Sequence, residues 1–552
     1  MAAYRRSQAF FETTRRLLAQ LINESLSHAT VEHVGPTQTC LNLHSPSLFG
    51  AAKKYPHIQV NLDRTIYLER HEAGVDSIVQ PCSLRPPVTL VDAEKKVEEW
   101  SPGVIFSFIR PWFADITSDD TLSKISQELQ NSAENQGNLS VEQKAPLTFD
   151  NPAIPWERTL VFGHRTHPFH RLCFAQPPPK AVTPGDIRDM ITPAIAFISI
   201  PRRDLHLVGP FEKWLQPLLD KLEVPSTTRN DRVVVPCLAQ QLPAVIPRFP
   251  NARIVRTIAH QAYAQASMRT ISLDPQLKFG YHLKFPLTCQ ITSVVRTITP
   301  WTGSGPALSD ILARLLPADL WLYRDIAVAY GSQEDFNDAR HLSCILRKDV
   351  EQRAMAMGQG LVIAAAIHQK PQGIDRTYAE VLFGLKESRQ KLQWLKSYVS
   401  CLFQLVFPPL VHHGIGMEVH GQNTVVRICR AIRRIRGFAV RDFGGIRLHT
   451  PTFNKKGIDL RSVLGDASIL TDSRQEVWSK VHHAMKYGGW SIVRNCMSKV
   501  LQQITGAIEN DVYEYFTHET MPYKCFLRMR TQEKKSRYRM FYGRFAKGDI
   551  AL

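Results

Sequence analysis

Apolar and polar positions divide the chain into segments of different character. In the first twenty residues, single acidic and basic residues interrupt the apolar side chains, a spacing that predicts an amphipathic helix. Two runs further on, 233–235 and 252–258, are rich in β-branched residues and predict strands. The stretch 130–144 has few apolar anchors, which predicts a surface loop or a domain boundary.

The second half of the chain begins with a helical pattern. This pattern runs from residue 349 to about residue 366 and again from 378 to 403. In the segment 424–440 apolar residues then alternate with arginines. The alternation predicts two strands joined by a tight turn at Arg436-Gly437.

Two polar clusters flank this predicted hairpin. The EVHGQN cluster occupies residues 418–423, and the RDFGG cluster occupies residues 441–445. Each places carboxylate, imidazole or amide groups beside glycine, a combination typical of sites that position metal-bound phosphates. We expect the two clusters to lie at opposite ends of the hairpin.

Composition narrows the class of protein. A chain of 552 residues is too long for a single core and predicts two or three domains. Its net charge of +18 favours anionic partners, either nucleic acid, a membrane surface or small polyanions. Nucleic acid is not expected, because the chain has no helix-turn-helix, zinc-finger or RNP signature. The longest apolar run, 398–411, is too short to span a bilayer, and no signal peptide is visible.

The cysteines indicate the redox environment. Ten cysteines are scattered along the chain without a CxxC pair. This pattern predicts reduced thiols and argues against a zinc site or a disulfide scaffold. We therefore expect a cytoplasmic protein with no nucleic-acid or membrane partner.

The first of three further candidate clusters, GHRTHP, occupies residues 163–168. Its two histidines, His164 and His167, lie beside a glycine and a proline on an expected turn. A metal ion would need further ligands, so contact with an anion is favoured over metal binding.

The other two clusters combine hydroxyl groups with cations. The SMRT cluster occupies residues 267–270, and in a strand Ser267 and Arg269 would point to one face and could hold one phosphate. The third cluster could hold a carboxylate or a phosphate and comprises Lys284, Thr292, Ser293, Arg296 and Thr297. A polar helix face, with Thr292 and Arg296 one turn apart, is an equal alternative.

The order of these clusters resembles a known family. GHRTHP, SMRT, Lys284 with TSVVRT, EVHGQN and RDFGG follow one another as in the NRPS-independent siderophore (NIS) synthetases, the aerobactin synthetase or IucA/IucC family. The resemblance runs from about residue 155 to about residue 530. It departs from the family pattern in the first cluster, where Arg165 replaces a proline and Arg171 stands near the position of a lysine.

The resemblance implies a fold and an activity. The fold would be α+β, shaped like a cupped hand, with a thumb at 1–150, fingers with a mainly antiparallel sheet at 151–347 and a mixed helical and sheet palm at 348–552. The enzyme would be an ATP-dependent ligase that adenylates a carboxylate of citrate or a related polycarboxylic acid. It would then condense the acyl group with an amine or hydroxyl to an amide or ester, releasing AMP and pyrophosphate, in siderophore or related specialised metabolism. We also expect a homodimer.

The resemblance also implies roles for individual residues. Those expected to hold ATP are His164, His167, Ser267, Arg269, Thr270, Lys284, Gln422, Asn423 and Asp442. Those expected to bind the carboxylate substrate are Thr292, Arg296 and His420. Mg²⁺ would be bound by Glu418 and Asp442. The catalytic residues would be Lys284, Arg296 and His420, with the histidine taking the proton of the attacking amine.

Two alternatives remain from the residues alone. Asp442-Phe443-Gly444 looks like the metal-binding DFG of protein kinases, with Asn423 upstream as a second metal ligand, and would suit a kinase-like phosphotransferase. Against this, the chain has neither an HRD-like aspartate before Asn423 nor a glycine-rich loop followed by a strand lysine. The charge of +18 would also suit a non-catalytic polyanion-binding protein.

Overall fold

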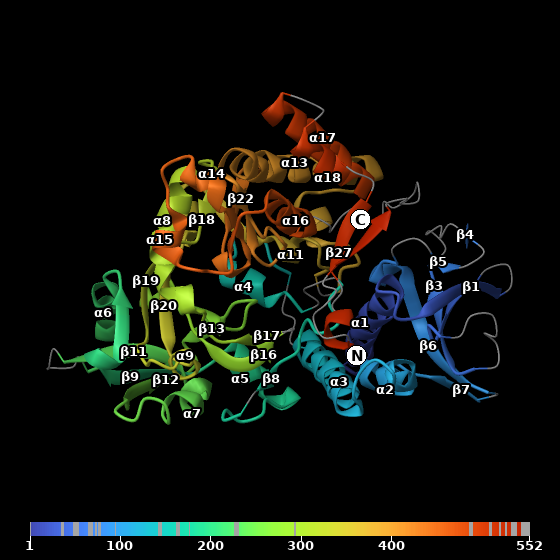
Figure 1. Cartoon of the computed structure of the whole chain (residues 1–552), viewed down its shortest axis with the longest axis horizontal. Helices are drawn as coiled ribbons and strands as arrows, with labels where there is room; N and C mark the ends of the chain where they lie inside the picture. Colours follow the sequence, from blue (N-terminus) through green and yellow to red (C-terminus); the bar gives the residue numbers. More distant parts are fainter. Residues whose placement is uncertain are drawn as a thin grey trace.

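Helices and mostly antiparallel strands follow one another without a regular βαβ alternation, so the fold is α+β, as predicted (Figure 1). This computed structural model describes residues 2–34, 38–47, 55–63, 70–71, 74–75, 79–93, 95–141, 146–161, 166–175, 177–225, 231–291, 294–371, 373–484, 490–506, 510–517, 520–524, 527–531 and 538–542. Three large hydrophobic cores organise these residues. The division of the chain at residues 150 and 347 stays a prediction.

The first core lies between an antiparallel sheet and helices from the N-terminal part of the chain. The amphipathic pattern predicted for the first residues forms helix α1, which places Leu17, Leu18 and Leu21 in this core. The sheet has the order β1-β2-β3-β6-β7. The elements of this part are α1 (Ala2–Asn23), β1 (His28–Val34), β2 (Gln38–His44), β3 (His57–Leu62), β4 (Arg70–His71), β5 (Gly74–Val75), β6 (Leu84–Asp92), β7 (Lys95–Glu98), α2 (Pro102–Phe108) and α3 (Asp119–Val141).

Helix α3 corrects the prediction of a loop at 130–144. The helix continues to Val141, and its amide and hydroxyl side chains make internal hydrogen bonds. Asn135 Nδ2 donates to the Arg171 carbonyl oxygen at 3.0 Å, and Gln136 Nε2 donates to the Ala9 carbonyl oxygen at 2.6 Å. These polar residues are therefore buried and connect α3 to other segments. The carbonyl oxygens that they face are buried and need hydrogen-bond donors, which the side-chain amides supply.

The second core is formed by antiparallel sheets. A six-stranded sheet has the order β10-β19-β20-β15-β14-β13, and two three-stranded sheets have the orders β11-β9-β12 and β17-β16-β8. The strands predicted at 233–235 and 252–258 are confirmed as parts of β11 and β12. The elements of this part of the chain, of which α4, α8 and β18 contribute to the third core described next, are α4 (Ala153–Arg158), β8 (Phe174–Ala175), α5 (Ile187–Ile191), β9 (Ile195–Pro201), β10 (Leu205–Val208), α6 (Phe211–Lys221), β11 (Arg232–Leu238), α7 (Leu242–Val245), β12 (Arg253–Ile258), β13 (Ala262–Ala264), β14 (Thr270–Leu273), β15 (Tyr281–Lys284), β16 (Leu287–Ile291), β17 (Val294–Arg296), α8 (Gly305–Leu315), β18 (Leu320–Leu322), β19 (Asp325–Gly331), α9 (Phe336–Ala339) and β20 (Ser343–Lys348).

The third core combines helices with mixed sheets of the orders β18-β24-β23-β21 and β22-β25-β26. Each of these sheets contains a parallel pair, β18 with β24 and β25 with β26. The elements are α10 (Glu351–Ala356), β21 (Gln359–Ile363), α11 (Ala364–Ile367), α12 (Tyr378–Leu382), α13 (Ser388–His413), β22 (Ile415–Gly416), β23 (Thr424–Cys429), β24 (Arg434–Val440), β25 (Arg447–His449), α14 (Thr450–Asn454), α15 (Leu460–Leu464), β26 (Leu470–Thr471), α16 (Arg474–Ala484), α17 (Trp490–Thr505), α18 (Asp511–Thr517), β27 (Thr520–Lys524), α19 (Arg528–Thr531) and β28 (Tyr538–Tyr542).

The helical tract predicted before the EVHGQN cluster is confirmed only in part. Strand β21 interrupts it, because the fully buried run QGLVI pairs with β23 as the last strand of the sheet β18-β24-β23-β21. The second predicted stretch, 378–403, is divided into α12 and α13 by a break at 383–387, and α13 extends beyond the prediction to His413. It ends at Gly414, whose φ of +66° is the left-handed conformation that commonly terminates helices, and the next residues lead into the cluster.

Two predictions from the sequence concern membrane-spanning segments and the state of the cysteines. No helix among the described residues has the length and apolar character needed to cross a membrane. The cysteines that the structure describes are all free thiols, and Cys525 lies outside the described residues.

Candidate active site

The hairpin of β23 and β24 brings the EVHGQN and RDFGG clusters to the same end of the sheet. Thr424 pairs with Val440 at the open end of the hairpin, and the Arg441 N–H donates to the Asn423 carbonyl oxygen at 3.1 Å. The expectation that the clusters lie at opposite ends is therefore wrong. In an antiparallel hairpin the start of the first strand faces the end of the second.

The turn of the hairpin also differs from the prediction. It occupies residues 430–433, and Arg433 has a φ of +51°. Gly437 instead lies inside β24 with a φ of +146°. A Cβ at Gly437 would lie 2.3 Å from the Asp319 carbonyl oxygen, so this glycine marks a close approach of two backbones.

Lys284 and Asp442 form the centre of the candidate site. Lys284 ends β15, and its Nζ lies 3.2 Å from Asp442 Oδ1, which joins residues 158 positions apart. Lys284 holds the pKa of Asp442 well below its usual range, although burial acts in the opposite direction. Burial lowers the pKa of Lys284 to about 8, although Asp442 opposes this shift. The carboxylate therefore keeps its charge, and the ammonium is the member of the pair that titrates near neutral pH.

Arg269 and Arg296 add positive charge around Asp442. Burial lowers the pKa of Arg269 to about 10 and also lowers the pKa of Arg296. Arg269 Nη1 lies 3.4 Å from the carbonyl oxygens of Arg296 and Thr297, so the side chain of Arg269 reaches strand β17. Desolvated cations around a single carboxylate suit a ligand with several negative charges.

The SMRT cluster forms a turn between β13 and β14, so the expectation that Ser267 and Arg269 share a strand face is wrong. Met268 has a φ of +64°, and Ser267 Oγ accepts a hydrogen bond from the Thr270 N–H at 3.2 Å. This local bond lets the serine stabilise a turn in place of a strand. Thr270 belongs to β14 and pairs with Lys284, so the turn still lies at the Lys284 end of the sheet.

Arg296 lies in strand β17, where it pairs with Leu287, and this contradicts the alternative of a polar helix face. Its predicted partner Thr292 lies outside the described residues. The extended conformation follows from the β-branched residues that precede the arginine.

The GHRTHP cluster is described only from residue 166 onward, so His164 lies outside the described residues. His167 is buried, and its Nδ1 accepts a hydrogen bond from the Phe169 N–H at 3.2 Å. Gln20 Nε2 of α1 donates to the Thr166 carbonyl oxygen at 2.9 Å. The described part of this loop therefore packs against the N-terminal helices.

Glu418 and His420 lie on the side of the site formed by the third core. Lys480 Nζ of α16 lies 2.6 Å from Glu418 Oε1. His420 Nδ1 accepts a hydrogen bond from the Gln422 N–H at 3.2 Å, which leaves the proton of the neutral ring on Nε2. Burial lowers the pKa of His420, although Glu418 opposes this shift. His420 is therefore a neutral imidazole that presents an N–H donor.

Arg441 ties the site to helix α4 and to the turn before β14. Its Nη1 and Nη2 donate to Glu157 Oε1 and Oε2 at 2.6 Å and 3.0 Å. Nη1 also donates to Gln265 Oε1 at 2.8 Å, and Nη2 donates to the Gln422 carbonyl oxygen at 2.8 Å. A buried ion pair with this many hydrogen bonds holds the chain firmly beside Asp442.

Three charged residues of the site are not among the sequence predictions. Arg347 of β20 pairs with Asp325, with Nε and Oδ1 2.7 Å apart, and both residues act electrostatically on Lys284. Lys480 is the third. An arginine directly after the mostly apolar run SCIL could have indicated a buried pair, because a buried charge needs a partner. Asp325 and Lys480 carry no comparable sequence signal.

Glu418 and Asp442 supply the carboxylate oxygens that Mg²⁺ prefers. Both act electrostatically on Arg296 and His420, so they lie in the same part of the site. Gly445 lies against the first carboxylate, because a Cβ there would be 1.6 Å from Glu418 Oε2. The described residues contain no group of three or more His, Cys, Asp or Glu side chains able to hold a metal ion. Two carboxylates therefore fit a magnesium ion only if phosphate or water oxygens complete its coordination.

Two family models match parts of the chain. The IucA / IucC family matches residues 242–369, which contain Arg269, Lys284 and Arg296. A family described as ferric iron reductase FhuF-like transporter matches residues 392–539, which contain both polar clusters of the hairpin.

The chain belongs to the NRPS-independent siderophore synthetases, a family of ligases, and the resemblance indicated by the motifs is confirmed. It is 40% identical over 558 residues to the NRPS-independent siderophore synthetase-like protein ankE of Aspergillus thermomutatus, which covers 96% of this chain and 92% of that protein. It is 28% identical to the NRPS-independent siderophore synthetase rfs of Rhizopus delemar, over 74% of this chain and 68% of that protein. It is 21% identical to a D-ornithine–citrate ligase of Staphylococcus aureus, over 50% of each chain.

Solved structures share the fold. The petrobactin biosynthesis protein AsbB of Bacillus anthracis superposes with a TM-score of 0.74 at 15% identity and covers 98% of this chain and 96% of its own. The ATP-bound aerobactin synthetase IucA of Klebsiella pneumoniae superposes with a TM-score of 0.71 at 13% identity and covers 96% of this chain and 99% of its own. These likenesses confirm the expected cupped-hand α+β fold.

Proposed function

We propose that this protein is an ATP-dependent ligase that adenylates a carboxylate of citrate or a related polycarboxylic acid and then joins it to an amine or a hydroxyl. The observation that carries the proposal is the grouping of the cations Arg269, Lys284 and Arg296 around the ionised Asp442. A site that joins a carboxylate to a phosphate must bring two anions into contact, and preorganised cations reduce their repulsion. Membership of a family of siderophore ligases supports the same chemistry, in siderophore or related metabolism.

The proposed reaction has two steps. A carboxylate oxygen first attacks the α-phosphorus of ATP, and the bond to pyrophosphate breaks. The amine or hydroxyl then attacks the acyl carbon and loses a proton, and AMP leaves with the electron pair of the acyl–oxygen bond. The acyl-adenylate is activated without a covalent bond to the enzyme, so the protein needs to supply positioning and charge neutralisation.

We assign the nucleotide to the cations and polar groups where the second and third cores meet. The proposed ATP contacts are Ser267, Arg269, Thr270, Lys284, Gln422, Asn423 and Asp442, together with His164 or His167. The shared fold with an ATP-bound synthetase supports the use of ATP. Lys284 and Arg269 would neutralise the phosphates, because burial has already removed much of their hydration.

We assign the carboxylate substrate to Thr292, Arg296 and His420. The Nε2–H of His420 suits a carboxylate oxygen, since the other ring nitrogen already accepts the Gln422 N–H. The same tautomer weakens the expectation that His420 removes a proton from the amine, because Nε2 already carries a hydrogen. Citrate is favoured by the name of the D-ornithine–citrate ligase among the relatives.

We further assign Mg²⁺ to Glu418 and Asp442, the two carboxylates that act electrostatically on Arg296. When bound there, the ion would neutralise charge on the phosphates of ATP. One oxygen of each carboxylate already contacts a lysine, Lys480 and Lys284 respectively.

The proposal is tested by hydroxylamine trapping across a panel of dicarboxylic and tricarboxylic acids. An acyl-adenylate gives a hydroxamate, and the same acid should support exchange of pyrophosphate into ATP. Release of ADP in place of AMP would support the kinase-like alternative. Absence of turnover with every acid would support a polyanion-binding protein.

Substitution of the two arginines tests the site itself. We expect Arg269→Ala and Arg296→Ala each to reduce hydroxamate formation by about a thousandfold, while the circular dichroism spectrum is unchanged, since each loses a charge needed in the transition state. Arg314→Ala, at an exposed position of α8, is the matched control and should retain normal trapping. Near-normal trapping in both site variants would reject the assignment.

We also propose a cytoplasmic location and a homodimer. The free cysteines support a reducing compartment. Light scattering on the purified protein tests the dimer, and a monomer at all concentrations would contradict it.

A further inference from the structure

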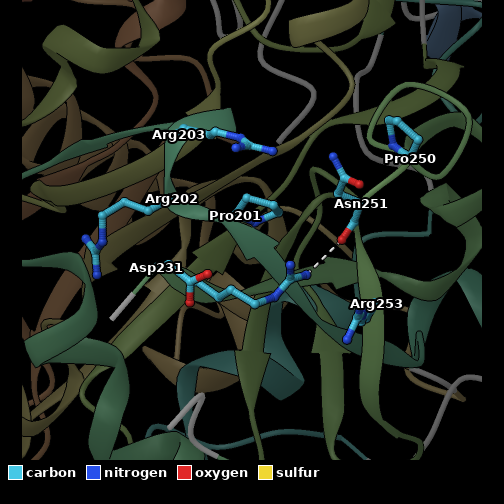
Figure 2. A pocket seen from close by; sticks show the side chains of 8 residues that line it. Pro201, Arg202, Arg203, Asp231, Pro250, Asn251 and Arg253 are labelled. Carbon is cyan, nitrogen blue, oxygen red and sulfur yellow. Dashed lines mark hydrogen bonds between the residues drawn. The ribbon is translucent and has the colours of Figure 1, made fainter. Parts of the chain in front are cut away.

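A hollow lined by arginines lies at the end of the sheet β11-β9-β12 (Figure 2). The end of β9 contributes Pro201, and the antiparallel partner β11 begins opposite it at Arg232. Strand β12 begins nearby at Arg253, paired with Ser199 of β9. The hollow has a volume of about 610 Å³, in the usual range of small-molecule sites. Its lining residues are Pro201, Arg202, Arg203, Asp231, Arg232, Pro250, Asn251 and Arg253.

The four arginines have different surroundings. Arg202 is turned aside in Figure 2 and forms two hydrogen bonds with Glu212, at 2.9 Å and 2.8 Å. Arg203 is 80% exposed, with Asp204 at 3.7 Å from its Nε. Arg253 is exposed and forms no ion pair with any residue that the structure describes.

Arg232 is held in place by neutral oxygens. Its Nε donates to Ser199 Oγ at 2.8 Å, and its Nη2 donates to the carbonyl oxygens of Ser199 at 2.7 Å and Asn251 at 2.8 Å. These bonds fix the orientation of the guanidinium. Asp231 is the carboxylate among the lining residues, so the lining carries an excess of positive charge. A prearranged guanidinium beside two exposed ones favours an anion with more than one charged group.

The hollow is separate from the candidate active site. Strand β11 runs from Arg232 at the hollow to Leu238, and the chain then reaches Gln241, whose Nε2 donates to Thr288 Oγ1 at 2.8 Å. Thr288 follows the partner of Arg296 in β16. The candidate active site therefore lies beyond the Leu238 end of β11, and the hollow lies at the Arg232 end. The two ends of the strand are roughly 20 Å apart at the usual rise per residue. Figure 1 likewise shows β9, β11 and β12 remote from α13 and α16.

We propose that this hollow, the arginine hollow, is a second binding site for a small polyanion that carries at least two phosphate or carboxylate groups. Arg232 would hold one anionic group at the base, and Arg203 and Arg253 would hold the other from the two sides. The rings of Pro201 and Pro250 supply rigid apolar walls. The inference does not depend on the proposed adenylation, because it uses none of the same residues.

Calorimetric titration of the whole chain tests the proposal. The background is Arg269→Ala, which weakens the proposed nucleotide site, and the probes are tripolyphosphate, citrate and acetate. We expect one saturable site per chain for tripolyphosphate or citrate and none for acetate. Tighter binding of tripolyphosphate identifies phosphates as the natural groups, and tighter binding of citrate identifies carboxylates.

Substitutions distinguish the arginine hollow from diffuse attraction to a basic protein. In the same background, Arg203→Gln together with Arg253→Gln should weaken the bound polyanion at least about tenfold, because two charged hydrogen-bonding groups are lost. Arg256→Gln, on the same strand β12 and outside the lining, is the matched control and should change the affinity less than about twofold. The proposal is overturned by absence of saturable binding, by equal binding of acetate, or by equal effects of the double variant and the control.

Discussion

Lys284 controls how the candidate site depends on pH. Its protonated form carries the charge that would hold phosphate, and its pKa is lowered to about 8 by burial. The charge is therefore present below that pKa and is lost as pH rises through it. We expect kcat/KM for ATP in the pyrophosphate-exchange reaction to fall on the alkaline side with a midpoint near 8, because this ratio reports ionisation in the free enzyme.

Lys284→Arg is the control for this dependence. An arginine keeps its charge, so the alkaline fall should disappear or shift upward even though the altered geometry lowers the rate. An unchanged midpoint in Lys284→Arg would assign the ionisation to another group.

We expect His420 to contribute to binding of the carboxylic acid substrate more than to binding of ATP. Its ring presents Nε2–H, because Nδ1 accepts the Gln422 N–H. His420→Ala should raise the KM for the carboxylic acid about tenfold or more, with a much smaller change for ATP, since the loss is one hydrogen bond to a charged group. Steady-state kinetics with each substrate varied in turn measure both constants. A loss confined to the amine-dependent step, with normal adenylation, would instead support the role of a base.

At the scale of elements, the loop after β24 depends on a contact between the two polar clusters. A Cβ at Gly445 would lie 1.6 Å from Glu418 Oε2, so Gly445→Ala must displace the Glu418 side chain. Because that side chain can move, we expect less than about 2 kcal/mol of lost stability. The Mg²⁺ concentration needed for half-maximal exchange should rise at least about tenfold, because a displaced carboxylate binds the ion more weakly.

Gly444→Ala is the matched control for this variant. A Cβ at Gly444 would meet only Asp442 Oδ1, at an ordinary 3.6 Å, and the backbone N–H that this oxygen accepts would remain. The control should bind Mg²⁺ nearly as the unmodified protein does. Equal effects of the two substitutions would show that Glu418 is not a metal ligand.

At the scale of the whole molecule, helix α19 near the C-terminal end of the described chain packs against the N-terminal helices. Arg530 Nη2 donates to both oxygens of Glu128 in α3, at 2.7 Å and 2.6 Å. The side chain of Glu24, the residue that follows α1, accepts a hydrogen bond from the Leu527 N–H at 2.9 Å. These contacts join segments about 400 to 500 residues apart in the sequence.

Removal of Arg530 should destabilise the protein in a manner that depends on pH. Burial raises the pKa of Glu128, and Arg530 opposes that shift, so Arg530→Gln raises the folded-state pKa further above the unfolded value. A raised carboxyl pKa favours folding at low pH, and this contribution is lost as pH rises through the folded-state value. We therefore expect a loss in the free energy of unfolding that grows as pH rises above the ordinary carboxyl range and reaches about 3 kcal/mol.

Urea unfolding at several pH values measures this effect. The double variant Glu128→Gln with Arg530→Gln removes the titrating group and should lose most of the pH dependence. A loss in Arg530→Gln that is equal at all pH values would contradict the explanation.

Local patterns in the sequence determined several elements correctly. The interrupted apolar residues of α1 and the β-branched runs of β11 and β12 form as predicted, because their periodicity selects a helix or a strand before any distant contact. The ordered motifs also identified the family. A polar stretch misled the prediction at α3, whose amides pair with backbone groups of other segments.

The site itself required long-range contacts. The sequence supplied Lys284, Arg269, Arg296 and Asp442 as candidates, but their roles stay predictions until the proposed experiments are done. It did not supply Arg347, because a single arginine in an apolar strand is informative only when its partner Asp325 is known. Both polar clusters lie at one end of the hairpin because β23 and β24 are antiparallel neighbours, a consequence that the predicted hairpin already contained.

The sequence by itself therefore determined the family, the α+β class and the types of residue available for binding anions. Only the tertiary structure decided which of them meet: Glu157 and Arg441 are 284 positions apart, yet they form the buried pair beside Asp442. The physical reason is that secondary-structure patterns report interactions between near neighbours. Burial, desolvated charge and shifted pKa values instead arise from groups that only the folded chain brings together.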